Sequence, residues 1–361
     1  MLGVYWVFTN FLLLEGCEKL LGYTFCLIVR LMETLLLTDE EVRGILSMRE
    51  LIDAVEEAFR EKALGRVQMP PKLYMFYDCG DLRVMPCHMP SLKLSSVKVV
   101  NSHPGNREKG LPTVMATILL IDPETGFPKA IMGGTWITAM RTGAAGAVAA
   151  KYLARKDSRI AAFIGAGTQA RTQLMGLLEV MESLQEIRVF DIRPEAERRF
   201  IEFFQENYGD RCSIHAARSA EKAVMGADIV VTTTPSRKPI VMSRWIGDGV
   251  HLNCIGADAP GKQELDPEIL KRASKIVVDD IEQAVHGGEV NVPISQGIIR
   301  REDIYGEIGE IVAGLKKGRE RSEEITVFSS TGLAIQDAVA ASLAYKRAVE
   351  KNVGSYLKLV A

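Results

Sequence analysis

The sequence predicts an α/β protein with a doubly wound parallel sheet, and three observations support this fold class. Short apolar runs alternate with helix-length stretches from residue 159 to residue 328. The first run ends at a pair of glycines, Gly165 and Gly167, where a helix is predicted to begin. The next run ends at an acid, Asp191. Alternating strands and helices are typical of a parallel sheet that is covered by helices on both faces.

Length and composition are those of an ordinary globular protein. The 361 residues are enough for two domains, and 25% of them are charged and 47% hydrophobic. A formal net charge of −2 gives no reason to expect nucleic acid or a membrane as a partner. The six cysteines form no C-x-x-C pair and the five histidines no H-x-x-x-H arrangement, so no metal site is indicated. A reduced, cytoplasmic location fits best.

Residues 1–31 differ from the rest, because they are rich in Leu, Phe, Tyr and Trp and their first basic residue is Lys19. A signal peptide needs positive charge before its apolar core, and a membrane-spanning helix needs about 20 uninterrupted apolar residues. The stretch has neither. We therefore expect translation to start at Met32 and residues 1–31 to be a start-site artefact; a membrane anchor is the alternative.

Residues 32–145 combine helices with strand-like segments. A short strand precedes Thr38 or Asp39, either of which can cap a helix. Apolar residues at helical spacing predict a second helix over 48–64. Short β-rich runs then predict an antiparallel sheet, with a hairpin turn at 122–126, from residues 72–77, 81–85, 95–100 and 114–121.

The Ala- and Gly-rich stretch 138–154 predicts a helix that packs closely on a neighbour. Beyond it, the pattern predicts strands and helices in alternation: strands over 159–164, 186–192, 229–234, 250–255, 276–279 and 325–328, and helices over 168–182 and 194–207. A last helix over 332–351 could return to the first part of the chain. We thus expect one domain over 146–332 and an α+β domain from 32–145 and 333–361.

The segment Gly165-Ala-Gly-Thr-Gln-Ala170 is the most informative motif. In a Rossmann unit such glycines let the backbone approach a pyrophosphate at a helix N-terminus, and an acid about 20 residues later binds the ribose hydroxyls. Asp191 has that spacing; the alternative is a glycine turn in an ordinary α/β unit. Because Asp191 would repel a 2′-phosphate, NAD is favoured over NADP, although Arg193 could soften the preference.

Four cations are candidates for a substrate site: Lys72, Arg83, Lys98 and Arg141. Each alone is more often a solvated surface residue. Lys98, however, interrupts an apolar strand that turns at 101–105, which is consistent with a side chain in a cleft. Arg141 opens the predicted Ala/Gly helix, where a cation is unfavourable, so we expect an anion to compensate.

Asp258 lies in a Gly- and Pro-rich loop after strand 250–255, at the carboxyl edge of the sheet, where open α/β sheets bind ligands. An aspartate in such a loop is also typical of an Asx turn, and spacing alone does not decide between the two. The segment His286-Gly-Gly-Glu289 also has two interpretations: a loop beside a cleft, or a turn that ends a helix.

Four motifs, in this order, resemble the ornithine cyclodeaminase/μ-crystallin family: Val97-Lys-Val-Val-Asn-Ser-His-Pro104, Met140-Arg-Thr-Gly-Ala-Ala145, Gly165-Ala-Gly-Thr-Gln-Ala170 and Gly256-Ala-Asp-Ala-Pro-Gly-Lys262. The resemblance runs from Met32 to the C-terminus. Within the family, the chain is most similar to archaeal NAD-dependent alanine dehydrogenases.

The resemblance implies that Lys98 is the catalytic lysine and Asp258 its acid/base counterpart. Such a base needs a lowered pKa, which neighbouring cations would provide. Lys72, Arg83, Lys98 and Arg141 would bind the substrate, with Arg141 also near the cofactor phosphates. The implied cofactor contacts are Thr113, Arg141, Gly165, Gly167, Thr168, Gln169, Asp191, Arg193, Thr232, Gly256, Ala257, Asp258, Lys262 and Ser330.

Arg83 separates the chain from the cyclodeaminases, which carry a glutamate there for the distal ammonium of ornithine. An arginine would repel that ammonium and attract an anion instead. We therefore expect reversible oxidative deamination of L-alanine to pyruvate and ammonia. The resemblance also implies a homodimer formed through the substrate domain. The alternatives are an ornithine cyclodeaminase that produces L-proline, a ketimine reductase, and a μ-crystallin-like dinucleotide-dependent binding protein. Retention of Lys98, Asp258 and Arg141 argues against the last.

Overall fold

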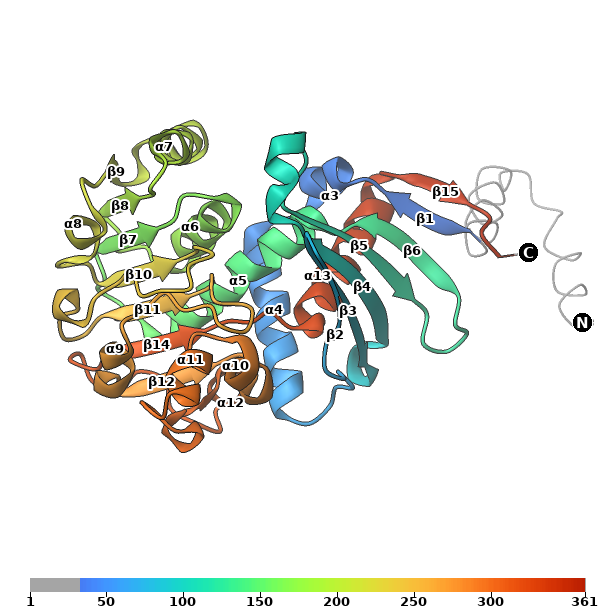
Figure 1. Cartoon of the computed structure of the whole chain (residues 1–361). Coiled ribbons are helices and arrows are strands. Elements are labelled where there is room, and N and C mark those ends of the chain that lie inside the picture. Colours follow the sequence, from blue (N-terminus) through green and yellow to red (C-terminus); the bar gives the residue numbers. More distant parts are fainter. Residues whose placement is uncertain (1–32, 361) are drawn as a thin grey trace, which may run out of the picture.

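The structure, a computed structural model, describes residues 33–360, so the prediction about residues 1–31 lies outside the described part. Two sheets, one of seven strands and one of eight, lie at opposite sides of the molecule (Figure 1). Three long helices lie between them: α4 (Met48–Ala63), α5 (Thr135–Leu153) and α13 (Ala334–Lys351).

The seven-stranded sheet has the order β15-β1-β6-β5-β4-β3-β2. Its strands are β1 (Thr34–Leu37), β2 (Leu73–Tyr77), β3 (Gly80–Met89), β4 (Leu94–Ser102), β5 (Val114–Ile121), β6 (Pro128–Gly133) and β15 (Ser355–Leu357). Neighbours are antiparallel, as predicted, except that β1 and β6 are parallel. The parallel pair was not predicted, because no hairpin joins β1 to β6 and the local pattern therefore leaves their direction open.

The eight-stranded sheet has the order β13-β12-β14-β11-β10-β7-β8-β9, and all its pairs are parallel. Its strands are β7 (Ile160–Ile164), β8 (Glu186–Phe190), β9 (Ser213–Ala216), β10 (Ile229–Thr232), β11 (His251–Cys254), β12 (Lys275–Val278), β13 (Gly306–Glu307) and β14 (Thr326–Ser329). The doubly wound parallel sheet is thereby confirmed. The short edge strands β9 and β13 were not predicted. The order reverses between β7 and β10, the switch point at which such sheets bind ligands.

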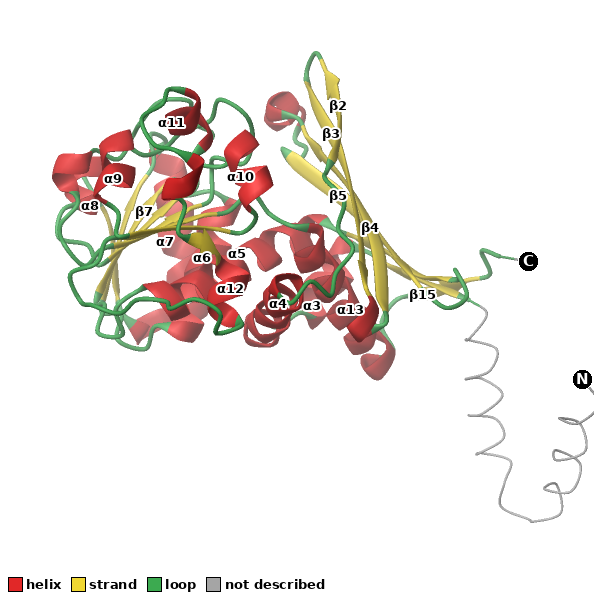
Figure 2. Cartoon of the chain, turned by 90° about the horizontal axis from the view of Figure 1, so that it is seen from below, coloured by secondary structure: helices red, strands yellow, loops and turns green. Residues whose placement is uncertain are grey.

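Helices cover both faces of the parallel sheet, as Figure 2 shows from below. They are α6 (Thr168–Val180), α7 (Pro194–Tyr208), α8 (Ala220–Val224), α9 (Pro267–Arg272), α10 (Ile281–Gly287), α11 (Asn291–Ser295) and α12 (Ile308–Val312). The remaining helix, α3 (Asp39–Ile45), begins at a capping box in which Thr38 and Glu41 bond each other's backbone N–H. Single 3-10 turns lie over Pro90–Leu92, Pro104–Lys109, Gly209–Arg211, Ser243–Trp245 and Arg301–Asp303.

Helix α5 packs closely on α6, as the Ala- and Gly-rich sequence predicts. A Cβ atom on Gly143 would lie 2.3 Å from the backbone oxygen of Thr172, and one on Gly146 would lie 1.9 Å from Oε1 of Gln173. Glycine is therefore required at position 143, where the clash is with backbone, whereas at position 146 the side chain of Gln173 would have to move. Helix α13 contacts α4, α5 and the antiparallel strands β3 and β4, so the last helix does return to the first part of the chain.

The predicted start of α5 was wrong, and with it the argument about Arg141. The helix begins at Thr135, because Asp39 Oδ1 accepts a hydrogen bond from the Trp136 backbone N–H at 2.7 Å and so stabilises an earlier first turn. Arg141 consequently lies in the second turn of α5 and does not open it. Over residues 33–360, no helix combines the length and the apolar character that crossing a membrane requires.

Candidate active site

The turn between β7 and α6 has the geometry of a dinucleotide cradle. Gly165 has a φ of +96°, which favours glycine, and a Cβ atom there would lie 2.8 Å from Thr233 Oγ1. Gly167 is the N-cap of α6, and no neighbouring atom lies within 4 Å of the position that a Cβ would take there. Thr168 and Gln169 follow as the first residues of α6. An open helix N-terminus without a side-chain cap is suited to a pyrophosphate.

Asp191 lies beside this turn, one residue beyond β8. Its Oδ2 accepts a hydrogen bond from the Ala166 backbone N–H at 2.9 Å, and its Oδ1 pairs with Arg193 Nε at 3.2 Å. Burial would raise the pKa of Asp191, but the hydrogen bonds from Ala166 and Arg193 hold the pKa below its ordinary value. Asp191 is therefore an ionised acid next to the glycine turn, as a ribose-binding residue must be. The residues present fit a dinucleotide cofactor.

A buried cluster of charges lies between the two sheets, with Lys98 of β4 at its centre. Lys98 Nζ lies 2.6 Å from Asp337 Oδ2, and each side chain is only 1% exposed. Asp337 Oδ1 accepts a hydrogen bond from Arg141 Nε at 3.0 Å, and Arg141 Nη1 donates to Gln336 Oε1 at 2.8 Å. The anion that we expected to compensate Arg141 is thus the protein's own Asp337, which the sequence analysis did not identify. The sequence feature that could have identified Asp337 is an acid within the largely apolar stretch 334–341.

Two lysines of the cluster have a lowered pKa. Burial lowers the pKa of Lys98 to about 7, against the charge of Asp337 and with help from Arg141 and Lys72. Burial likewise lowers the pKa of Lys72 to about 8, opposed by Asp279 and assisted by Arg83 and Arg141. The lowered pKa expected of Lys98 is present, with burial as the larger cause. A lysine with a pKa near neutrality can accept and return protons.

Lys72 is held by the segment that joins β14 to α13. Its Nζ donates to the carbonyl oxygen of Thr331 at 2.8 Å. That segment is organised by Asp279, which accepts hydrogen bonds from the backbone N–H of Thr331 and of Gly332, both at 2.7 Å, and from the Ser330 hydroxyl at 3.1 Å. Asp279 is a second residue that the sequence analysis missed. The predicted cofactor contact Ser330 is buried and bonded to it.

Asp258 lies on the loop after β11, where its charge acts on Lys72, and its side chain is 33% exposed. Its Oδ1 lies 2.5 Å from Lys262 Nζ and its Oδ2 lies 3.1 Å from Arg83 Nη1. Burial would raise the pKa of Asp258, but Lys262 and Arg83 hold the pKa well below its ordinary range. Arg83 also pairs with Asp81, at 2.8 Å from Nε to Oδ1. Arg83 of β3 thereby links the antiparallel sheet to the loop of Asp258.

Other predicted residues gather around Glu264 at the same edge of the parallel sheet. Thr232 is fully buried and its hydroxyl donates to Glu264 Oε2 at 2.7 Å. The backbone N–H of Gly256 donates to the same oxygen at 2.9 Å, and Ala257 beside it is buried. Thr113 precedes β5, where its carbonyl oxygen accepts from the backbone N–H of His103 at 2.8 Å.

The segment 286–289 combines both predicted possibilities. Helix α10 ends at Gly287, and a Cβ on Gly287 would lie 3.4 Å from Ala259, so the turn contacts the loop that carries Asp258. Glu289 points inward and is fully buried. In the described part of the chain, no His, Cys, Asp and Glu side chains group as metal ligands.

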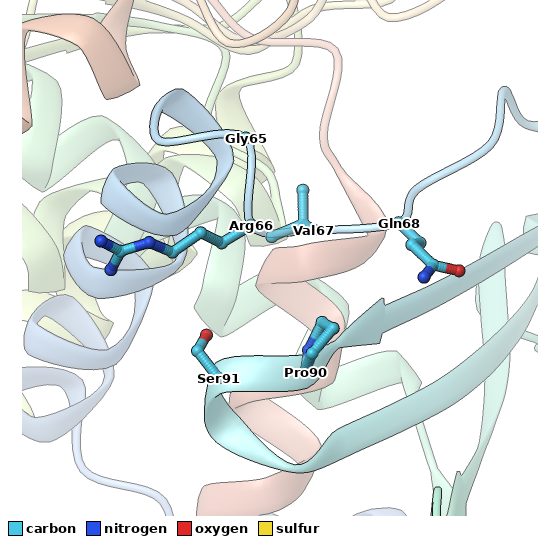
Figure 3. A pocket seen from close by; sticks show the side chains of 6 residues that line it. All are labelled: Gly65, Arg66, Val67, Gln68, Pro90 and Ser91. Carbon is cyan, nitrogen blue, oxygen red and sulfur yellow. The ribbon is translucent and has the colours of Figure 1, made fainter.

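A separate surface pocket lies between the segment after α4 and the 3-10 turn that follows β3 (Figure 3). It is lined by Gly65, Arg66, Val67, Gln68, Pro90 and Ser91, and by none of the predicted site residues. Ser91 and Arg66 both bond the carboxylate of Glu61. These contacts give the pocket a structural role.

Comparison with known proteins agrees with this geometry. The model of the ornithine cyclodeaminase/mu-crystallin family matches residues 32–352. The alanine dehydrogenase of Archaeoglobus fulgidus is 55% identical over 327 residues, which cover 91% of this chain and 99% of that enzyme. A solved archaeal alanine dehydrogenase dimer with bound NAD superposes with a TM-score of 0.86 at 55% identity, over 91% of this chain and 100% of that one.

A second solved structure is the Δ1-pyrroline-2-carboxylate reductase of Thermococcus litoralis in complex with NADH and L-proline. It superposes with a TM-score of 0.87 at 43% identity, over 90% of this chain and 100% of that one. The order of the motifs, the two sheets and the extent of these matches lead to one conclusion: the chain belongs to the ornithine cyclodeaminase/mu-crystallin family.

Proposed function

We propose that this protein is an NAD-dependent alanine dehydrogenase, which converts L-alanine and water to pyruvate and ammonia and also catalyses the reverse reaction. The observation that carries the proposal is the buried cluster of Lys72, Lys98 and Arg141, with the pair of Arg83 and Asp258 beside Lys72. The 55% identity with an alanine dehydrogenase over nearly its whole length supports this choice of reaction.

The cofactor would be held by the glycine turn and its neighbours. Gly165, Gly167 and the first residues of α6 would receive the pyrophosphate, and Asp191 would bind the ribose diol. NAD, when bound, accepts a hydride from the α-carbon of the amino acid. Asp191 favours NAD because its negative charge opposes a 2′-phosphate, and Arg193 is already paired with it.

The chain's own residues bind the substrate and move protons. Lys72 and Arg141, with Arg83 near them, provide positive charge for the substrate carboxylate. With a pKa of about 7, Lys98 exists in both its neutral and its charged form near neutral pH, so it can take a proton from the substrate amine or from water. Asp258 is ionised, so it donates only a proton that it has first accepted. Its pairs with Lys262 and Arg83 lower its pKa and make it a weak base, so they must loosen before it accepts a proton.

Arg83 argues against ornithine cyclodeamination. Its guanidinium pairs with Asp81 and Asp258, so a substrate ammonium at this place would meet a cation and would compete for both carboxylates. Reduction of Δ1-pyrroline-2-carboxylate is the second candidate, because the 43% identical reductase superposes as well as the alanine dehydrogenase does. Both candidates use a hydride and a lysine that handles protons, and they differ in the imine that the site accepts.

We also propose that residues 32–145 and 333–361 form a substrate-binding and dimerisation domain, that residues 146–332 form the NAD-binding domain, and that the protein works as a cytoplasmic homodimer. Apolar side chains on edge strand β2 support a dimer, since Leu73 is 55% exposed and Phe76 is 76% exposed. Light scattering on purified protein would test this assembly.

The reaction is tested by measuring NADH formation with a panel of L-amino acids, together with NADH oxidation by pyruvate plus ammonia and by Δ1-pyrroline-2-carboxylate. We expect alanine to give the highest kcat/KM among the amino acids. A higher kcat/KM for the cyclic imine would replace the proposed reaction with the second candidate.

A further inference from the structure

Two adjacent buried acids, Glu264 and Glu289, lie at the carboxyl edge of the parallel sheet and have no part in the proposed proton transfers. Both residues are fully buried. Glu289 Oε1 accepts hydrogen bonds from the backbone N–H of Glu264 at 3.0 Å and of Leu265 at 2.7 Å. Within residues 33–360, neither carboxylate forms an ion pair with a Lys or Arg, and burial is the main cause that shifts the pKa of each. Two such charges without a cation are unfavourable, so one of the acids keeps its proton.

Glu264 has the hydrogen-bond partners of an ionised carboxylate. Its Oε1 accepts from the backbone N–H of Thr234 at 2.6 Å and from the Thr234 hydroxyl at 2.8 Å. Its Oε2 accepts from the Thr232 hydroxyl at 2.7 Å and from the backbone N–H of Gly256 at 2.9 Å. Burial raises the pKa of Glu264 above its ordinary value, but these four donors on two oxygens oppose that effect and favour the charged form.

Glu289 receives fewer donors than Glu264, because in the described structure only the backbone N–H groups of Glu264 and Leu265 bond its carboxyl oxygens. Burial raises the pKa of Glu289 well above its ordinary value, and the neighbouring charge of Glu264 adds to this effect. The thiol of Cys254, which also faces both acids, has its pKa raised by burial and by the two carboxylates, so it is neutral as well. The proton of the pair therefore resides on Glu289.

The carboxylate of Glu264 closes the loop that carries Asp258. The loop runs from Gly256, two residues after the end of β11, to Glu264. The hydrogen bond from the Gly256 backbone N–H to Glu264 Oε2 joins its two ends. A Cβ on Gly256 would lie 2.1 Å from the backbone oxygen of Thr234 and 2.7 Å from Glu264 Cδ, so the backbone contacts the carboxylate directly. Between these ends, the loop presents both Asp258 and its partner Lys262.

We propose that Glu264 is the positioning residue for Asp258. The carboxylate of Glu264 closes the 256–264 loop and so fixes the position of Asp258 relative to Arg83. Glu289 in turn holds the backbone of Glu264. This rests on the acid/base role proposed for Asp258. Asn291 supports the same loop from α11, since its Oδ1 accepts from the backbone N–H of Gly261 at 3.0 Å.

The test compares Glu264→Gln with Glu289→Gln in the full chain. An amide has a single acceptor oxygen, so Gln at position 264 cannot accept from the backbone N–H groups of both Thr234 and Gly256. A displacement of about 1 Å can lower a rate on the order of 100-fold, so kcat of Glu264→Gln should fall on the order of 10- to 100-fold. The Kd for NADH should change less than kcat. Glu264 bonds Thr232 and Gly256, two of the implied cofactor contacts, but it does not contact Gly165 or Asp191, which are proposed to hold the pyrophosphate and the ribose.

Glu289→Gln is the matched control, because it replaces a neutral acid by a neutral amide of the same shape. Its kcat should stay close to that of the unmodified protein. Hydrogen exchange of the 256–264 peptide gives a readout that does not depend on turnover: Glu264→Gln should lose amide protection there, and Glu289→Gln should keep it. Equal effects of the two variants, or a Glu264→Gln loss confined to KM, would overturn the proposal.

Thr234→Val provides a milder variant, because it removes one hydroxyl donor and leaves the carboxylate charged. Thr234→Val should lower kcat by a smaller factor than Glu264→Gln does. If Glu264→Gln fails to fold, an unchanged kcat of Thr234→Val would refute the positioning role of Glu264. The unmodified protein is assayed first with the amino-acid panel. Absence of alanine turnover would refute the proposed reaction, whereas the comparison of exchange in the 256–264 peptide would still decide the role of Glu264.

Discussion

Lys98 Nζ and Asp337 Oδ2 are 2.6 Å apart in a place that solvent hardly reaches. The lysine belongs to the antiparallel sheet, and the aspartate to the helix that follows the last strand of the parallel sheet. Because the other oxygen of Asp337 bonds Arg141, a single carboxylate holds two of the proposed substrate-binding cations. It also opposes the burial that lowers the pKa of Lys98. Asp337 therefore sets both the position and the proton affinity of the lysine.

Asp337→Asn should lower the pKa of Lys98 below its present value of about 7, because Asp337 is the main group that raises it. Lys98 acts as a base only when it is neutral, so the acidic limb of the kcat/KM profile should move to lower pH, by about one unit. We also expect kcat to fall about tenfold, since Lys98 and Arg141 lose their common partner.

Asp157→Asn is the control for this change, because it removes the same charge from a side chain that is 81% exposed. Its pH profile and kcat should match those of the unmodified protein. If the acidic limb of the Asp337→Asn profile does not shift, the pKa that it reflects is not that of Lys98.

Asp191→Ser should erode the preference for NAD over NADP. The change removes the charge that opposes a 2′-phosphate and releases Arg193, whose Nε pairs with Asp191 Oδ1 at 3.2 Å. Because the contact is remote from the reacting carbon, KM for NAD should rise about tenfold with little change in kcat. Steady-state kinetics with both cofactors measure this, and the exposed Glu195→Gln serves as control. A higher kcat/KM for NADPH in the unmodified protein would contradict the role of Asp191.

The cofactor turn could be predicted from the sequence because its parts are local. Gly165, Gly167 and Asp191 belong to one strand-helix-strand unit. Gly165 is favoured by its positive φ, Asp191 by its charge, and Gly167 leaves the helix N-terminus open to a ligand. The parallel sheet followed from the same alternation. The start of α5 could not be predicted, since it depends on a hydrogen bond that the Trp136 backbone N–H donates to Asp39 of another helix.

The acids that organise the site were also missed, for a related reason. Asp337, Asp279 and Glu264 are single acids within apolar or turn segments, and their partners lie on elements far away in the sequence. A local pattern shows that such an acid is unusual but not which group it meets. The cations Lys98 and Arg141 were singled out by their places in the sequence, and the family resemblance then gave them roles. Their shared partner appeared only with the fold.

His251 should make the protein less stable in mild acid. Its buried ring lies 2.9 Å from Asn253 Oδ1 and 3.0 Å from Thr326 Oγ1. Burial and the charge of Arg319 lower the pKa of His251 from 6.5 to about 3. Between these pH values only the unfolded chain binds the proton, so the free energy of unfolding should decrease as pH falls, by about 1.4 kcal/mol per pH unit.

Urea unfolding at pH 7 and at pH 5 measures this dependence. His251→Gln should weaken it, whereas His215→Gln should leave it unchanged, because the side chain of His215 is 53% exposed. Equal pH dependence in the His251→Gln variant and the unmodified protein would show that other groups cause the acid sensitivity.

Arg83 distinguishes alanine oxidation from ornithine cyclodeamination. In the structure its guanidinium lies between Asp81 and Asp258, with Nη1 3.1 Å from Asp258 Oδ2. Arg83→Glu would place a third carboxylate there, which would raise the pKa of Asp258 and remove a cation from the substrate carboxylate. Alanine oxidation should fall on the order of 100-fold, while the distal ammonium of ornithine would gain a partner.

Arg300→Glu, which reverses the charge of a side chain that is 76% exposed, is the control and should leave alanine oxidation unchanged. The decisive measurement uses the unmodified protein, in which ammonia release from ornithine, with proline as product, is compared with NADH production from alanine. The Arg83–Asp258 pair excludes a substrate ammonium from this place only if the alanine reaction is faster. If ornithine reacts faster, the guanidinium must move away from Asp258 on binding, and cyclodeamination then replaces dehydrogenation as the function of the site.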